Sequence, residues 1–207
     1  MPDRVCFYFD PICPWSYQTS RWARRLEELG VIDLDWGLFS LELQNASKEP
    51  EELARARARS ERALRTAVAV RDAAGRKAVG TFYKAVGERV HERGEALDDP
   101  ATVEAALTEA GLDPALCAQA WEDPTTAERV AGEHRELCEQ TRSFGVPTIV
   151  LDGGEGPAIF GPVITEVPSD HDAEELWRHV SWLARHDNFA ELKRDRVPLL
   201  DLESVRQ

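Results

Sequence analysis

The sequence predicts an α/β protein in which a long helical segment interrupts a small sheet. Apolar runs of the kind that form strands lie near both ends of the 207-residue chain, at residues 5–9, 31–39 and 145–160. Residues 45–142 instead repeat apolar side chains at helical spacing. Strand–helix–strand order at the start and strand–strand–helix order at the end favour one sheet built from both ends of the chain.

The N-terminal segment is typical of a β-α-β unit. Val5–Phe9 is apolar at nearly every position, as in a strand buried on both faces. A helix is expected from Pro14 to about Leu29, where Gly30 provides a stop signal, and a second strand from 31 to 39. Since such crossovers are right-handed, the two strands should be parallel and adjacent, or nearly so. The start of the helix then lies at the carboxyl edge of the sheet, where ligands bind in open α/β folds.

The middle of the chain is expected to be helical throughout. The apolar periodicity predicts helices over residues 51–74, 80–90, 102–110, 114–121 and 125–142. His134 and Cys138 share an apolar face of the last helix and are interpreted as core residues rather than a redox pair. The expected division is therefore 1–45 and 142–207 for the two sheet-forming segments, and 46–141 for a helical insertion.

The C-terminal part is expected to complete the sheet. A strand over residues 145–151 begins at Val146-Pro147, because a proline in a strand must stand where no ladder N–H is lost. A glycine-rich turn and the short run Ala158–Phe160 predict a hairpin, which Gly161-Pro162 ends. A helix is expected over 172–184, followed by a short helix around residues 189–194.

Charge and composition argue against several classes of partner. The net charge is −13 and the pI about 4.9, whereas a nucleic-acid partner requires a basic surface. No apolar run approaches the ~20 residues that span a bilayer, so no membrane association is expected. The N-terminus Met1-Pro2-Asp3-Arg4 has no basic and apolar leader, and a cytoplasmic location is the expectation.

The four cysteines are not equivalent. None lies in a Cys-x-x-Cys pair and none has zinc-finger spacing to histidine, which argues against a metal site. Cys6, Cys117 and Cys138 are expected to be buried free thiols. Cys13 differs because Pro14 suits the first position of a helix, so that Cys13 becomes the N-cap. The N–H groups of the next residues and the helix dipole then favour a thiolate, which is the nucleophilic form.

The order strand, turn, Cys-Pro-x-x, helix resembles the thioredoxin superfamily, and the run from Phe9 to Trp15 resembles its DsbA-like branch. The whole predicted layout, a thioredoxin fold with a large helical insertion, is also similar to kappa-type glutathione transferases and 2-hydroxychromene-2-carboxylate isomerases. Further motifs in the same order look like the mycothiol-dependent nitroreductase group of DsbA-like proteins. They are Thr19-Ser20-Arg21-Trp22, Ser40-Leu41, Asn45, Gly87-Glu88-Arg89-Val90-His91, Val146-Pro147-Thr148, Phe160-Gly161-Pro162-Val163, Leu176-Trp177 and residues 189–194.

The resemblance implies a set of site residues. Cys13 would be the nucleophile, Val146-Pro147 a cis-proline loop that faces it, and Pro14 and Trp15 part of the pocket wall. Asn45 and His91 would line the same pocket. Other roles also fit these residue types: Trp15 as a cover over the helix start, Asn45 as a cap of the first insertion helix or a turn-closing residue, and His91 as a surface cation at a helix end.

Ser16 departs from the pattern of that group, in which Cys-Pro-Trp-Cys is common. A serine cannot resolve a mixed disulfide, and its hydroxyl can only hydrogen-bond to the sulfur of Cys13 or of a bound thiol. The predicted catalytic pair, Cys13 and Ser16, therefore implies a monothiol mechanism with mycothiol or glutathione as co-substrate and an electrophilic or disulfide substrate. A distant resolving cysteine, or activation of a small thiol without disulfide turnover, remains open.

Three functions fit these observations. The first is a cytoplasmic thiol-dependent oxidoreductase that acts through Cys13. The second is a thiol-dependent isomerase or transferase, although isomerases of that type usually carry serine at the nucleophile position. The third is a non-catalytic thiol-binding module in which Ser16 marks the loss of redox function.

Overall fold

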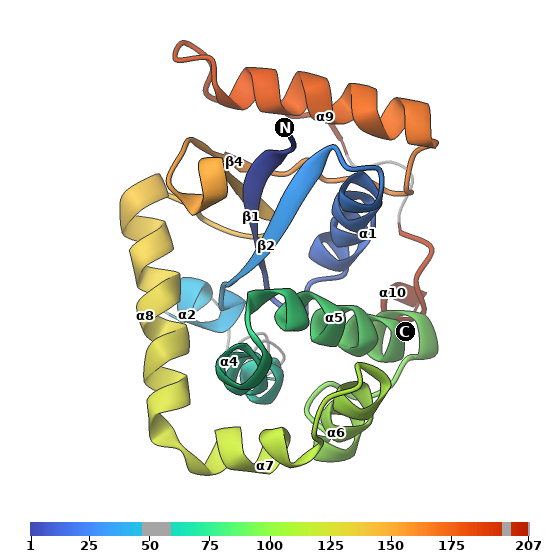
Figure 1. Cartoon of the computed structure of the whole chain (residues 1–207), viewed down its shortest axis with the longest axis vertical. Coiled ribbons are helices and arrows are strands. Elements are labelled where there is room, and N and C mark those ends of the chain that lie inside the picture. The colour runs from blue at the N-terminus through green and yellow to red at the C-terminus, as the bar shows by residue number, and fades with distance from the viewer. Residues whose placement is uncertain (47–58, 196–199, 207) are drawn as a thin grey trace.

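The computed structural model describes residues 1–46, 59–195 and 200–206 (Figure 1). Its sheet has the strand order β2-β1-β3-β4. β1 pairs in parallel with β2, so that Phe7 lies beside Trp36, and pairs antiparallel with β3. The expected β-α-β unit and the C-terminal hairpin are both confirmed. The strands are β1 (Asp3–Phe9), β2 (Ile32–Leu38), β3 (Thr148–Leu151) and β4 (Ala158–Phe160).

The helices follow the predicted periodicity closely. They are α1 (Pro14–Glu28), α2 (Leu41–Asn45), α4 (Glu61–Ala74), α5 (Arg76–Gly87), the π-helical turn η1 (Glu88–Glu92), α6 (Pro100–Glu109), α7 (Ala115–Glu122), α8 (Pro124–Thr141), the short η2 (Asp152–Gly154), α9 (Asp170–Ala184) and α10 (Glu203–Arg206). The N-terminal part of the helix expected over 51–74 lies outside the described residues. Among those described, no helix is long and apolar enough to cross a membrane.

Three of these helices begin in the same way, with a capping side chain directly before a proline. Asp99 and Asp123 each precede a proline, and the carboxylate of each accepts the backbone N–H two residues later, which caps α6 and α8. Cys13 holds the same position before Pro14 at the start of α1, where its sulfur takes the place of the carboxylate. The sequence thus puts a thiol where this chain elsewhere puts a capping anion.

Helices cover the sheet and extend from it (Figure 1). α9 lies along α1 at one end of the sheet, where the Trp22 and Trp177 rings are 6.1 Å apart and Trp22 donates to the carbonyl of Ala173. α8 runs along the opposite side, and its Leu137 joins Phe39, Val146 and Val150 in a small apolar cluster. α4 to α7 form the body of the insertion.

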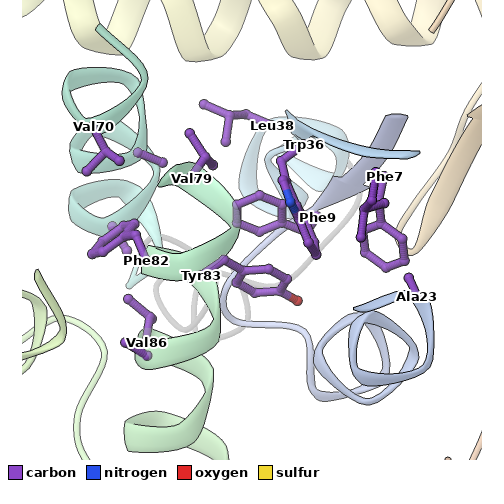
Figure 2. Close-up of a cluster of buried hydrophobic side chains, with 14 of the residues drawn as sticks. Phe7, Phe9, Ala23, Trp36, Leu38, Val70, Val79, Phe82, Tyr83 and Val86 are labelled. Carbon is purple, nitrogen blue, oxygen red and sulfur yellow. The ribbon is translucent and has the colours of Figure 1, made fainter. Parts of the chain in front are cut away.

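α5 joins the insertion to the sheet. Figure 2 shows Phe9 and Trp36 of the sheet facing Tyr83 of α5, and the rings of Phe9 and Tyr83 stack at 3.8 Å. Their apolar area is buried in one continuous core that spans the sheet and the insertion. Because Phe9 stands immediately before the turn that leads to Cys13, this packing also fixes the position of α5 relative to the site.

Two sequence expectations for the chain were wrong. Residues 189–194 form no helix; the described C-terminal helix is α10, which contacts η1. The helix expected over 80–90 begins earlier, at Arg76, and its end widens into the π-helical turn η1. Such turns are rare and occur frequently at functional sites.

Candidate functional site

Cys13 lies at the N-terminus of α1, as the sequence predicts. Its backbone is extended (φ −87°, ψ 109°), and the Ser16 N–H donates to its sulfur over 3.4 Å. The sulfur also lies 3.8 Å from the carbonyl oxygen of Val146 and is partly exposed. A partly exposed thiol that receives an N–H at a helix start is placed to act as a nucleophile.

Asp10 shapes the turn that precedes Cys13. The side chain is fully buried, and its two oxygens accept the N–H groups of Ile12 at 3.1 Å and Leu41 at 2.7 Å. Its carbonyl accepts the N–H of Cys13 at 3.0 Å. The turn is therefore tied to the start of α2. The sequence contained Asp10 in the motif, but the Leu41 contact joins residues 31 positions apart and had no local signal.

The loop that faces the sulfur is built from two prolines. Both the Val146–Pro147 and the Gly161–Pro162 peptide bonds are cis. The carbonyl of Pro147 accepts the N–H of Gly161 at 2.8 Å, and the carbonyl of Pro162 accepts the Thr19 hydroxyl at 3.0 Å. The loop is thus fastened to β4 and to α1. Only the first of the two bonds lies at a position where the resemblance implies the cis form.

Ser16 is buried and faces the insertion. Its side chain is 0% exposed, and its hydroxyl oxygen accepts a hydrogen bond from the Tyr83 hydroxyl at 3.3 Å. Burial holds the pKa of Tyr83 well above its usual value, so that the phenol stays protonated and can donate. Tyr83 was predicted only as part of an apolar helix face; its role beside the site depends on a contact between α1 and α5 that sequence spacing does not reveal.

His91 is buried, so the interpretation of this residue as a surface cation at a helix end was wrong. It lies in η1, is 1% exposed, and bridges two distant segments: Nε2 lies 2.9 Å from the carbonyl of Pro11 and Nδ1 lies 2.8 Å from the Ser204 hydroxyl. Since a carbonyl can only accept, Nε2 carries the proton and Nδ1 accepts from Ser204. Burial lowers the pKa of His91 to about 4, and the ring is neutral at pH 7.

The C-terminal segment covers the same side of the site. Leu200 and Leu202 form a small cluster with the buried Tyr17, and Trp15 packs against it partly exposed. The Tyr17 hydroxyl donates to a Glu92 carboxylate oxygen at 2.6 Å, and its ring stacks on His91 at 5.1 Å. Trp15 therefore stands between the site and the C-terminal segment, in a position that fits both its pocket role and its covering role.

This packing predicts that replacing Leu202 with aspartate will release the C-terminal segment. Leu202 is 5% exposed, and a buried unpaired carboxylate destabilises a docked segment by at least ~2 kcal/mol. We expect the backbone amides of α10 to exchange hydrogen at least about tenfold faster, as measured by mass spectrometry. Val205→Asp, at a position 38% exposed, is the matched control and should leave the exchange nearly unchanged. Equal exchange in both variants and the parent protein would contradict the docking.

Asn45 lies at the end of α2, beyond the turn that precedes Cys13. It is the last residue of α2, and its side-chain amide donates to the carbonyl of Leu41 at 2.8 Å. The bond closes the helix turn whose first N–H is held by Asp10. This contact fits the turn-closing role, whereas the start of the insertion helix that Asn45 was expected to cap lies outside the described residues.

The other three cysteines are free thiols in less reactive surroundings. Cys6 is buried, and burial raises the pKa of its thiol to about 12. Burial also raises the pKa of Cys117 and, with Glu139, that of the half-buried Cys138. His134 accepts the Ser40 N–H on Nδ1, so that its protonated Nε2 faces the Cys138 sulfur at 3.8 Å and cannot serve as its base.

Comparisons with known proteins show the family and the fold of this chain. Residues 12–194 match the model of the Rv2466c-like family, described as mycothiol-dependent nitroreductase Rv2466c. The chain belongs to this Rv2466c-like family. Membership confirms the resemblance in the sequence and indicates a thiol oxidoreductase of the DsbA-like type. No group of three or more metal-binding side chains occurs in the parts of the chain that the structure describes.

A relative and two solved structures extend the comparison of this Rv2466c-like chain. The Mycobacterium tuberculosis protein Rv2286c is 33% identical over 206 residues, which cover 98% of this chain and 86% of the relative. The cytosolic disulfide reductase DsbM from Pseudomonas aeruginosa has a TM-score of 0.60 at 13% identity, over 87% of this chain and 99% of that chain; it has also been solved with GSH. A probable DsbA oxidoreductase from Streptomyces coelicolor, SCO1869, has a TM-score of 0.56 at 16% identity, over 94% of each chain. The two structures confirm the DsbA-like thioredoxin fold.

Proposed function

We propose that this protein is a cytoplasmic oxidoreductase that acts through the single thiol of Cys13, with mycothiol as its small-thiol co-substrate. The observation that carries the proposal is the sulfur itself. It caps α1, receives the Ser16 N–H and is partly exposed, while the Val146 carbonyl at 3.8 Å can accept the S–H of the neutral form. The other three thiols have raised pKa values, whereas Cys13 stands at a helix N-terminus, where the N–H groups and the helix dipole favour the anion.

The cycle requires one external thiol because Ser16 stands where a second cysteine would resolve the intermediate. The Cys13 thiolate attacks the small-thiol sulfur of a mixed disulfide, and the other half of the substrate leaves as a thiolate that takes up a proton. A second small-thiol anion then attacks the new Cys13 disulfide. It leaves with the first as a symmetric disulfide, and Cys13 returns to the thiolate. One free small thiol is oxidised for each mixed disulfide reduced: its sulfur pairs with the small-thiol sulfur of the substrate, and the other half of the substrate is released as a thiol.

The remaining residues would form the pocket. In this proposal Val146 and Pro147 present backbone groups to the bound thiol, Pro14 and Trp15 form one wall, and His91 holds the turn through the carbonyl of Pro11. Asn45 supports that turn from α2. The segments 1–45 and 142–207 would supply the thiol and the loop that faces it, and the insertion 46–141 would cover them. The family description supports mycothiol over glutathione as the thiol, and the cytosolic neighbour DsbM supports the location.

The test is the intact mass of the protein after separate exposure to mycothiol disulfide and glutathione disulfide. We expect one adduct on Cys13 with mycothiol disulfide, at least about tenfold faster than with glutathione disulfide, and its loss when mycothiol is added. Cys13→Ser should abolish the adduct, whereas Cys138→Ser, the matched half-buried thiol, should retain it.

Other results of these experiments would favour one of the alternative functions. An adduct that forms on Cys138, or an internal disulfide in place of the adduct, would overturn the single-thiol cycle. Isomerase or transferase turnover that survives Cys13→Ser in the presence of added thiol would favour the isomerase type. No adduct with either disulfide would favour a non-catalytic module.

A further inference from the structure

A line of polar side chains runs along the buried side of α1, beginning directly below Cys13. Ser16, Ser20 and Arg24 follow one another at four-residue spacing, which places them on one face of the helix. Ser16 and Ser20 are both 0% exposed. The face is turned toward α5, where an apolar stripe would be the ordinary choice, so that these polar groups require partners.

Their partners converge on Tyr83. Its hydroxyl donates to Ser16, while its ring stacks on Phe9 and lies 5.2 Å below the Arg24 guanidinium. Arg24 also donates to the Ser20 hydroxyl at 2.6 Å and to the carbonyl of Gly80 at 3.1 Å. In Figure 2 the Tyr83 oxygen points away from α5 toward α1. The ring stack leaves this phenol little freedom to turn elsewhere.

In the hydrogen bond between Tyr83 and Ser16, the tyrosine is the donor and the serine oxygen the acceptor. Ser16 has one hydroxyl proton, and because Tyr83 donates to its oxygen, that proton is available for a different acceptor. The backbone N–H of the same residue already donates to the Cys13 sulfur at 3.4 Å. The Ser16 hydroxyl oxygen is three bonds from that backbone nitrogen, which allows it to reach the same sulfur. A hydroxyl that accepts a hydrogen bond from a neighbour is also a stronger donor.

We propose that Tyr83 is a positioning residue that acts through Ser16, orienting the serine O–H toward the Cys13 sulfur so that it stabilises the thiolate. This inference rests on the proposed single-thiol function. The two hydroxyls would stabilise the Cys13 thiolate by hydrogen bonding, but they leave the mixed disulfide to be resolved by an external thiol. No proton is transferred: the serine proton is shared with the anion and returns when the mixed disulfide forms.

Several charged or titratable groups lie on the elements that pack around Cys13 and Tyr83. Arg24 lies over the Tyr83 ring and acts to lower the pKa of that phenol, against the larger effect of burial. Asp10 holds the turn before Cys13 by accepting the N–H groups of Ile12 and Leu41. Burial keeps Tyr83 protonated, and the charge of Cys13 contributes to that effect. The others that approach are His91 through the carbonyl of Pro11, and Tyr8 and Cys138 through the shared apolar cluster.

The test is the pH profile of iodoacetamide alkylation at Cys13, followed by intact mass for Tyr83→Phe, Ser16→Ala and the double variant. At pH 6 we expect alkylation to be about threefold slower in Tyr83→Phe and up to about tenfold slower in Ser16→Ala, because the profile moves to higher pH. The double variant should match Ser16→Ala within about 1.5-fold, since Tyr83 acts only through the serine. Tyr8→Phe, which removes another half-buried phenol near the site, should keep the parent profile.

Distinct results separate the failure of this inference from the failure of the proposed function. The proposed role of Tyr83 would be overturned by an unchanged alkylation profile in Tyr83→Phe, or by a double variant whose rate falls by the product of the two single effects. Adduct formation with mycothiol disulfide would still hold in either case. Loss of that adduct in the parent protein would remove the function itself. Thermal unfolding shows whether each variant is folded. If Tyr83→Phe does not fold, the alkylation profile of Ser16→Ala decides. A Ser16→Ala profile that coincides with the parent profile would refute the proposed role of the two hydroxyls.

Discussion

Replacing Ser16 with cysteine should convert this protein from a monothiol to a dithiol enzyme. A cysteine three residues after Cys13 at a helix start has its Cβ about 5–6 Å away, which a small rotation brings into disulfide range. After mild oxidation we expect the intact mass to fall by about 2 Da. The adduct with mycothiol should drop at least about tenfold, because the internal thiol displaces the small thiol faster than a second external one can.

The matched control is Ser20→Cys. Ser20 is equally buried and lies on the same helix face, but it is seven residues from Cys13, about 10 Å along the helix axis. That variant should keep the single-thiol adduct and form no internal bond. Ser16→Ala should also keep the adduct. If Ser16→Cys accumulates the mycothiol adduct at the parent level, the serine is not what makes this site a monothiol one.

The sequence predicts the parts of this site that are local. The Cys13 N-cap follows from one residue and the proline after it, because the capping geometry is set within a single turn. The parallel pairing of β1 and β2 follows from the handedness of the crossover. In each case the information lies within a few residues or in a general rule of chain geometry.

The parts that the sequence missed depend on distant contacts. His91 is joined to Pro11, 80 residues before it, and to Ser204, 113 residues after it. Nothing near a histidine in the sequence tells whether its helix end will face solvent or another segment. The Tyr83–Ser16 contact spans 67 residues. The tail was misjudged for a related reason: residues 189–194 have helical composition, but Leu192 is 81% exposed, and burial rather than composition stabilises so short a helix.

Replacing His91 with phenylalanine should lower stability at neutral pH and flatten its decline in acid. The phenyl ring can keep the stack on Tyr17 but loses both hydrogen bonds, and it leaves the Pro11 carbonyl buried without its donor. This should cost about 1–3 kcal/mol of unfolding free energy at pH 7.5. The turn before Cys13 loses an anchor, so that adduct formation with mycothiol disulfide should slow as well.

The acid dependence follows from the sign of the pKa change at His91. The folded pKa is about 4 and the unfolded value about 6.5, so the unfolded chain binds the proton first as pH falls through this window. The contribution of the neutral ring is complete above pH 6.5 and is lost toward pH 4, by about 3 kcal/mol in total. Urea unfolding at pH 7.5, 6 and 5 should therefore show a steeper loss for the parent protein than for His91→Phe. His179→Gln, at an exposed ring, should keep the parent slope, and equal slopes in all three proteins would mean that His91 is not held neutral between Pro11 and Ser204.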